Sequence, residues 1–218
     1  MTGSNSKTLR NILWSLMALW FLAVLLASYI GVFSTWMNVP IPLGVAAGLP
    51  ILAFAIWYWS SGYFREYVLS LNPVVLTAVQ TWRIGGITFI ILMAMGLLPP
   101  PFALPAGLGD FAIGVTAPFV AYALSKKALP SKAFVAWHYA GIADLVVAVT
   151  TGVLSSRGAT GILAHGTTTR IMGLLPMSLI PTFFVPLLLI LHIICLAQMR
   201  QLKRERIEPS GRPSLSLA

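Results

Sequence analysis

Three side chains that are charged at neutral pH lie inside the apolar segments of this chain: Arg83, Asp110 and Asp144. A charged side chain at the centre of a bilayer costs about 2.5–3.5 kcal/mol on insertion scales, so such groups pair, line water or serve function. Gln80 lies three residues before Arg83 and shares its helix face. These four residues form the candidate buried polar centre. Two interpretations stay open: an ion pair that only fixes helix packing, or a centre that binds a ligand or relays protons.

The position of each charge along its apolar segment predicts its depth. Arg83 lies about nine residues and Asp144 about eleven residues from the inner end of their segments, which places both near mid-membrane at 1.5 Å per residue. Asp110 lies only about four residues from the outer end of its segment, so we expect it to be shallower. The sequence therefore favours Asp144 as the main counter-ion of Arg83.

Two histidines form a second candidate site. His138 and His192 lie about five and six residues from the inner ends of their segments, and thus at a similar depth. Paired histidines on two helices can ligate haem iron or another metal. A haem-b or quinone redox membrane protein that uses His138 and His192 is therefore one alternative function. The leading interpretation predicts no cofactor.

The stretch Gly107-Leu108-Gly109-Asp110 resembles the Gly-x-Gly-Asp signature of intramembrane aspartyl proteases, and of presenilins in particular. The resemblance implies that Asp110 and a second acid, here Asp144, share a proton and activate water. In that family the other aspartate precedes the motif and a Pro-Ala-Leu triplet follows it. In this chain Asp110 is the first aspartate and no such triplet follows. Intramembrane proteolysis by Asp110 and Asp144 is a further alternative.

The composition identifies the class of protein. Hydrophobic residues make up 58% of the 218 residues, charged residues only 9%, and the mean hydropathy is +0.88, whereas soluble domains contain about 25% charged residues. The net charge of +9 comes from short basic stretches between apolar runs. This pattern predicts contact with anionic lipid headgroups and no binding of nucleic acid. The single cysteine, Cys195, excludes an internal disulfide.

Six segments approach the length of about 20 apolar residues that a membrane-spanning helix needs. They predict an all-α membrane protein with a single bundle of six transmembrane helices in residues 12–198, between a cytoplasmic N-terminus (1–11) and a basic, disordered cytoplasmic tail (199–218). The expected spans are 12–33, 43–59, 74–97, 106–124, 133–154 and 174–198.

The charges of the connecting segments predict the orientation. With the N-terminus in the cytoplasm, only Arg157 and Arg170 fall outside, and eleven basic residues fall inside. Cytoplasmic loops carry the excess of Lys and Arg, so the bias predicts that both termini are cytoplasmic. The inside residues are Lys7, Arg10, Arg65, Lys126, Lys127, Lys132, Arg200, Lys203, Arg204, Arg206 and Arg212.

Prolines and glycines mark the unusual connections. The stretch 98–105 contains four prolines and is expected to form a stiff external elbow rather than a helix. Residues 155–173 form the longest loop outside the membrane. Pro176, Pro181 and Pro186 are expected to bend the outer half of the last span.

Three stretches, Thr81–Gly86, Phe102–Asp110 and Leu179–Pro186, are similar to those of uncharacterised multi-pass proteins of the bacterial inner membrane. The resemblance implies that location and no particular activity. Nucleotide-binding loops and zinc-hydrolase motifs are absent from the sequence. The leading hypothesis is thus a non-catalytic protein: a small-solute or proton-coupled transporter, or an accessory subunit of a membrane complex. A homo-oligomer or a larger complex is expected.

Overall fold

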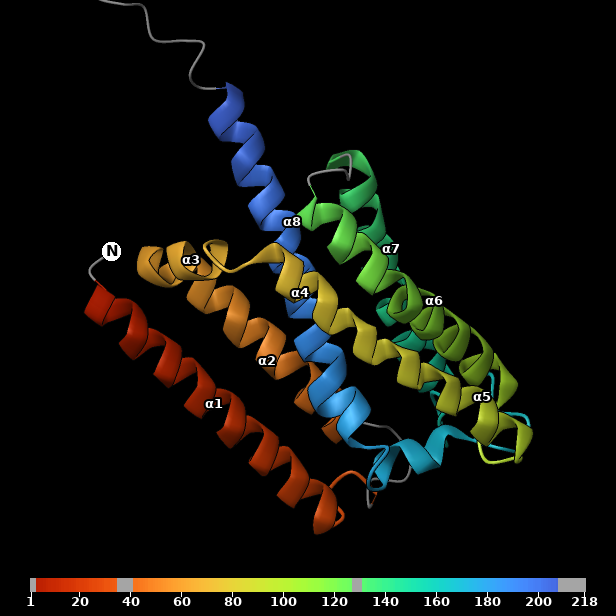
Figure 1. The fold of residues 1–218 in the computed structure, drawn as a ribbon. Helices are drawn as coiled ribbons and strands as arrows, with labels where there is room; N and C mark the ends of the chain where they lie inside the picture. The colour runs from red at the N-terminus through yellow and green to blue at the C-terminus, as the bar shows by residue number, and fades with distance from the viewer. Residues whose placement is uncertain (1–2, 35–40, 127–130, 208–218) are drawn as a thin grey trace, which may run out of the picture.

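The computed structural model describes residues 3–34, 41–126 and 131–207, and every regular element in these ranges is helical (Figure 1). In chain order the elements are α1 (Gly3–Tyr29), α2 (Ile41–Ser60), α3 (Gly62–Leu69), α4 (Pro73–Val79), the 3₁₀ helix η1 (Gln80–Gly86), α5 (Ile87–Ala94), α6 (Pro100–Ser125), α7 (Ser131–Leu154), the 3₁₀ helix η2 (Thr169–Gly173), the π-helical turn η3 (Ile180–Phe184) and α8 (Val185–Ile207).

Six helical stretches of the described residues are long and apolar enough to cross a membrane. The prediction of an all-α protein with six such helices is confirmed. The stretches are Lys7–Tyr29, Ile41–Ser60, Pro73–Ala94, Pro100–Ser125, Lys132–Leu154 and Ile180–Arg204.

The proline-rich stretch 98–105 is not an elbow. Helix α6 begins inside it at Pro100, after Pro99 in an extended conformation. Proline suits the first turn of a helix, because the amide hydrogens there have no partner within the helix and the ring fixes a helical φ angle. The prediction that these prolines exclude a helix was wrong, and α6 starts about six residues earlier than expected.

The third span contains a change of helix type. It runs from α4 through the 3₁₀ helix η1 into α5, so residues 80–86 are wound more tightly than the segments on either side. The sequence prediction gave 74–97 as a single span and did not anticipate this change. The element at its centre carries both Gln80 and Arg83.

The last span begins at Ile180 rather than at residue 174. The π-helical turn η3 leads directly into α8, and Pro181 and Pro186 lie near the starts of these two elements. Neither proline has an amide hydrogen to donate, so the regular hydrogen-bond ladder changes there. The prolines therefore mark where the helix type changes, in the N-terminal half of this span.

The basic segment after residue 198 differs from the predicted disordered tail. Helix α8 continues to Ile207, and residues 208–218 lie outside the described residues. Arg200, Lys203 and Arg204 lie in the last turns of α8, where cations interact favourably with the helix dipole.

Helices α4 and α8 lie between two pairs, with α1 and α2 on one side and α6 and α7 on the other (Figure 1). Helix α6 packs against η1, α5, α4 and α7, and α8 packs against α7, α2 and α4. The N-terminal end of α1 and the C-terminal end of α8 point toward the same end of the molecule (Figure 1).

Two apolar clusters border the middle of the helix assembly. One contains Phe89, Phe102 and Met172, and the other contains Leu76, Phe134 and Ile194. The segments that carry Arg83, Asp110 and Asp144 run between these clusters.

Candidate functional site

Arg83 projects from η1 and is only 3% exposed. Helix α6 approaches η1 closely because residue 114 is glycine. A Cβ atom at Gly114 would lie 2.7 Å from the carbonyl carbon of Arg83 and 3.0 Å from the Cα atom of Ile84. A 3₁₀ stretch in the middle of a helix often marks a functional hinge. The 3₁₀ segment that carries Arg83 is thus also the segment that packs most tightly against Gly114 of α6.

Arg83 joins Asp110 of α6 and Asp144 of α7 in one ion-paired cluster, here called the Arg83 centre. Arg83 Nε donates to Asp110 Oδ1 at 2.6 Å, and Nη2 donates to Asp144 Oδ2. The side chain of Arg83 is 1% exposed, and those of Asp110 and Asp144 are 13% and 12% exposed. With both acids ionised, one positive charge faces two negative charges. The centre then carries one negative charge in excess.

Asp110 lies deeper than its sequence position suggested. Because α6 starts at Pro100, Asp110 lies ten residues into the helix, which corresponds to about 15 Å from its N-terminal end. That depth brings Asp110 level with Arg83, and both acids bind the guanidinium directly. The expected ion pair of Arg83 with Asp144 is present, and Asp110 is a second direct counter-ion. The prediction of a shallow Asp110 was wrong because the start of α6 was misplaced.

His192 and His138 continue the polar contacts of Arg83 toward α8 and α7. Arg83 Nη1 lies 3.2 Å from His192 Nε2, and the Nδ1 atoms of His192 and His138 are 2.7 Å apart. Both imidazoles are fully buried. A Cβ atom at Gly141 would lie 2.5 Å from His192 Nε2, so only glycine leaves room for this ring. The two candidate sites of the sequence are therefore one connected site.

The hydrogen bonds determine the protonation pattern of two neutral imidazoles. Arginine only donates hydrogen bonds, so His192 Nε2 accepts and His192 carries its proton on Nδ1. That proton is donated to His138 Nδ1, which leaves the His138 proton on Nε2. Among the described residues, His138 Nε2 has no partner. The second Nη1 hydrogen of Arg83 is donated to the Gly141 carbonyl oxygen at 3.2 Å.

Gln80 lies beside the Arg83 centre but does not contact its acids in the contacts described. Its side chain is fully buried, and Nε2 donates to the carbonyl oxygen of Leu188 in α8 at 3.1 Å. Within the described part of the chain, Gln80 Oε1 has no partner. Gln80 thus ties η1 to α8, one turn away from Arg83.

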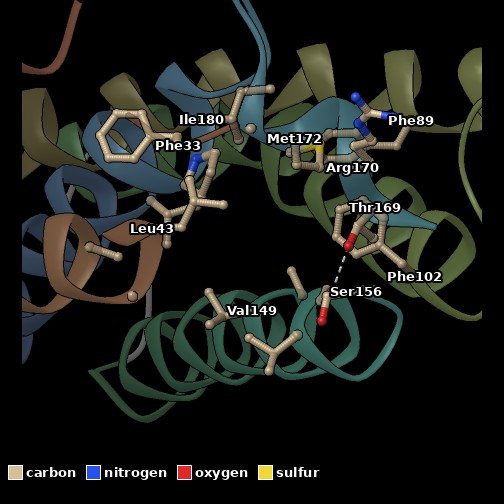
Figure 2. A pocket seen from close by; sticks show the side chains of 18 of the residues that line it. Phe33, Leu43, Phe89, Phe102, Val149, Ser156, Thr169, Arg170, Met172 and Ile180 are labelled. Atoms are coloured by element: carbon tan, nitrogen blue, oxygen red, sulfur yellow. Dashed lines mark hydrogen bonds between the residues drawn. The ribbon is translucent and has the colours of Figure 1, made fainter. Parts of the chain in front are cut away.

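A cavity of about 160 Å³ lies toward the end of the molecule at which α7 ends, and Asp110 is part of its lining. Figure 2 shows its wall, which includes Phe33 and Leu43 from the α1–α2 side and Val149 from α7. Phe102 and Met172 add further apolar surface. The cavity is therefore mostly apolar and has one carboxylate of the Arg83 centre in its wall.

The polar residues near the end of α7 and in η2 also line this cavity. Thr169 Oγ1 donates to the Gly152 carbonyl oxygen at 2.9 Å, which holds η2 against α7. Arg157 and Arg170 line the cavity and are exposed. They are the two basic residues that the sequence analysis predicted on the side of the membrane opposite the cytoplasm. The loop 155–173, which the sequence left unassigned, thus supplies part of the cavity wall.

The geometry bears on the two enzymatic alternatives. In an aspartyl protease the two acids share a proton, whereas Asp110 and Asp144 each bind Arg83. Two nitrogens bound to one zinc ion would lie ~3.3 Å apart, whereas the Nδ1 atoms of His138 and His192 are 2.7 Å apart. Within the described residues, no cluster of three or more potential metal ligands occurs. In this arrangement the acids serve as counter-ions and the imidazoles as hydrogen-bond partners.

Sequence reasoning missed the contact of Arg83 with His192, the 3₁₀ helix η1 and the cavity. The sequence did contain one signal for the contact of Arg83 with His192. Gly141 lies midway between His138 and Asp144 in the sequence, and in the structure it adjoins both Arg83 and His192. The cavity had no such signal, since its walls come from segments far apart in the sequence.

A family profile described as a domain of unknown function, DUF8737, matches residues 36–200. The chain belongs to the DUF8737 family. This agrees with the prediction of an uncharacterised family. The DUF8737 region contains the entire Arg83 centre and both histidines, whereas α1 precedes it. No curated protein and no solved structure matches the chain.

Proposed function

We propose that this DUF8737 protein is a proton-coupled transporter of a small solute in the bacterial inner membrane. The cavity is the solute site, and the Arg83 centre is the proton site. The observation that carries the proposal is that the cavity ends at Asp110, one of two buried carboxylates that share a single cation. A solute in the cavity and a proton on the centre would thus be in direct electrostatic contact.

The excess negative charge makes the Arg83 centre a proton acceptor. An uncompensated charge within a membrane is costly, and one proton on either carboxylate makes the centre neutral. Arginine does not release its proton in proteins, so Arg83 is a fixed cation rather than a relay. The exchangeable proton therefore resides on Asp110 or Asp144. Asp110 has direct access to the cavity.

Alternating access requires an element that changes conformation, and we assign this role to η1. It carries Arg83 at the centre of the third span, and it is joined to α6 and α7 by ion pairs and to α8 by the Gln80 hydrogen bond. A change in these bonds on protonation would act on a segment that is already wound differently from its flanking helices.

The charge distribution supports cytoplasmic termini. Lys7 and Arg65 lie near the same end of the helix assembly as Lys132, whereas Arg157 lies at the end of α7 opposite Lys132. The excess of cations at one end is expected on the cytoplasmic side. Of the basic residues counted in the sequence, Lys127, Arg206 and Arg212 lie outside the described side chains.

The test is solute-driven proton movement in proteoliposomes that contain a trapped pH dye. Solutes whose charge does not change near the working pH are used, because they do not carry protons across the bilayer by passive permeation. At least one class of anion, cation or neutral solute should drive proton movement in the wild type but not in Asp110→Asn. Glu66→Gln, a matched acid-to-amide change at an exposed site, should keep the activity. Proton movement equal to that of empty liposomes for every class would overturn the proposal.

A further inference from the structure

The basic residues of the outer end are concentrated at the cavity. Arg157 and Arg170 both line it, although cations are disfavoured on the outer side of a bacterial membrane protein. Both side chains are exposed, and the structure gives neither an ion pair with a described acid. Their position beside an apolar cavity is complementary to a ligand with an anionic group and an apolar body.

The cavity volume limits the size of that apolar body. A dry cavity of about 150 Å³ in a protein core accommodates a benzene molecule, and this cavity has a comparable volume of about 160 Å³. Phe89, Phe102, Met172 and Leu145 contribute its apolar wall. A body of about six to eight carbon atoms therefore suits it.

The Arg83 centre, at the end of the cavity that Asp110 lines, determines when an anion can bind. Asp110 faces Arg83 from η1 and Asp144 from α7, and His192 of α8 and His138 of α7 lie behind Arg83. With both acids ionised, the centre has one excess negative charge, which repels an anion in the cavity. One proton on the centre removes this repulsion. Anion binding and proton binding therefore favour each other, and the linkage is reciprocal.

We propose that the cavity binds a small monoanion with an apolar body about the size of a benzene ring, and that it takes up one proton on the Arg83 centre with each anion. This proposal rests on the proposed function and names its substrate class. Arg157 and Arg170 attract the anionic group, and the aromatic and aliphatic wall holds the body. Asp110 or Asp144 receives the proton, so the solute and the proton bind together without net charge.

The experiment is isothermal titration calorimetry of the purified full chain in detergent. Four probes of similar size cover three charge states: benzoate and benzenesulfonate are anions, benzylamine is a cation and benzyl alcohol is neutral. Benzoate and benzenesulfonate should bind, and their affinity should fall about tenfold per pH unit above the titration of the centre. Benzenesulfonate stays ionised throughout, so its pH dependence reports a proton on the protein. Titrations in buffers of different ionisation enthalpy should give one proton taken up per anion.

The variants separate the two ends of the cavity. Asp110→Asn should bind benzenesulfonate with an affinity that no longer depends on pH. Arg157→Gln with Arg170→Gln should weaken anion binding by about tenfold, whereas Arg65→Gln, a matched change at an exposed site away from the cavity, should not. If Asp110→Asn fails to fold, the proton count in the wild type still decides the question.

Two results would overturn the inference: stronger binding of benzylamine than of benzoate, or anion binding without proton uptake. The proposed function can fail separately. Anion binding with proton uptake, but without proton movement in proteoliposomes, would keep the ligand class and refute transport. Proton movement driven only by cationic or neutral solutes would keep transport and refute the ligand class.

Discussion

Arg83→Gln is expected to be the most destabilising single substitution in the Arg83 centre. It removes the only cation of the centre and leaves Asp110 and Asp144 facing each other without a counter-ion. Breaking a buried ion pair by removing one partner costs about 3–5 kcal/mol. The two charge-assisted hydrogen bonds that are lost, at about 1.5–3 kcal/mol each, give a similar value.

Neutralising one acid is expected to cost less. Asp110→Asn or Asp144→Asn leaves Arg83 paired with the remaining carboxylate and makes the centre neutral. The loss then approaches that of one charge-assisted hydrogen bond, about 1.5–3 kcal/mol. The double variant Arg83→Gln with Asp144→Asn leaves one unpaired carboxylate instead of two. It should therefore be more stable than Arg83→Gln alone.

Thermal unfolding in detergent, followed by tryptophan fluorescence, measures this order. Arg83→Gln should lower the Tm by ~10 °C, taking about 2–4 °C per kcal/mol for a chain of this length. Arg65→Gln removes an exposed arginine of α3 and should leave the Tm nearly unchanged. A wild-type Tm for Arg83→Gln, or a larger loss for either single acid variant, would refute the charge count on which the proton site is based.

Three further predictions concern the same site and its orientation. Gly114→Ala should lower the Tm, at a cost of about 1–3 kcal/mol, because its Cβ atom would meet the backbone of η1; Gly85→Ala, where a Cβ atom meets nothing within 4 Å, should not. His192→Leu should cost about 1–3 kcal/mol by leaving His138 without its partner, and His138→Leu with His192→Leu should cost less than the sum of the single changes; additive losses would contradict the pair. Reporter fusions after Ser61 and at the C-terminus should report cytoplasm and a fusion after Thr160 the outside; a periplasmic C-terminus would refute the orientation.

The number of membrane-length helices was predictable from the sequence, and so were several of their boundaries, even in α2, which contains Pro50. The helix Ile41–Ser60 matches the expected span 43–59 closely, and Lys132–Leu154 matches 133–154. The helix at Pro100 was missed because prolines were taken only as helix breakers. In the first turn they are compatible with a helix, and this one error moved the expected depth of Asp110 by about six residues.

The members of the Arg83 centre were predictable because the cost of placing a charge in an apolar segment can be read from that segment alone. Each charge in an apolar segment must find a partner, whatever the arrangement of the helices. The geometry of the partners depends on close approach between helices, which small residues permit but do not specify. Gly114 and Gly141 show this: each is an ordinary glycine of an apolar helix in the sequence, and each gives room to a neighbour of Arg83 in the structure.

The contact between Arg83 and His192 changes the interpretation of both candidate sites, because it joins the histidines and the acids in one site. Considered by depth alone, the histidines were potential metal ligands, and the acids were a separate ion pair. In the structure His192 accepts from Arg83 Nη1 and donates to His138, whereas Nε and Nη2 of Arg83 bind the two acids. Each nitrogen of the Arg83 guanidinium thus has a partner, and arginine keeps its positive charge in proteins. The carboxylates of Asp110 and Asp144 are therefore the groups of the centre whose protonation can change when a ligand binds in the cavity.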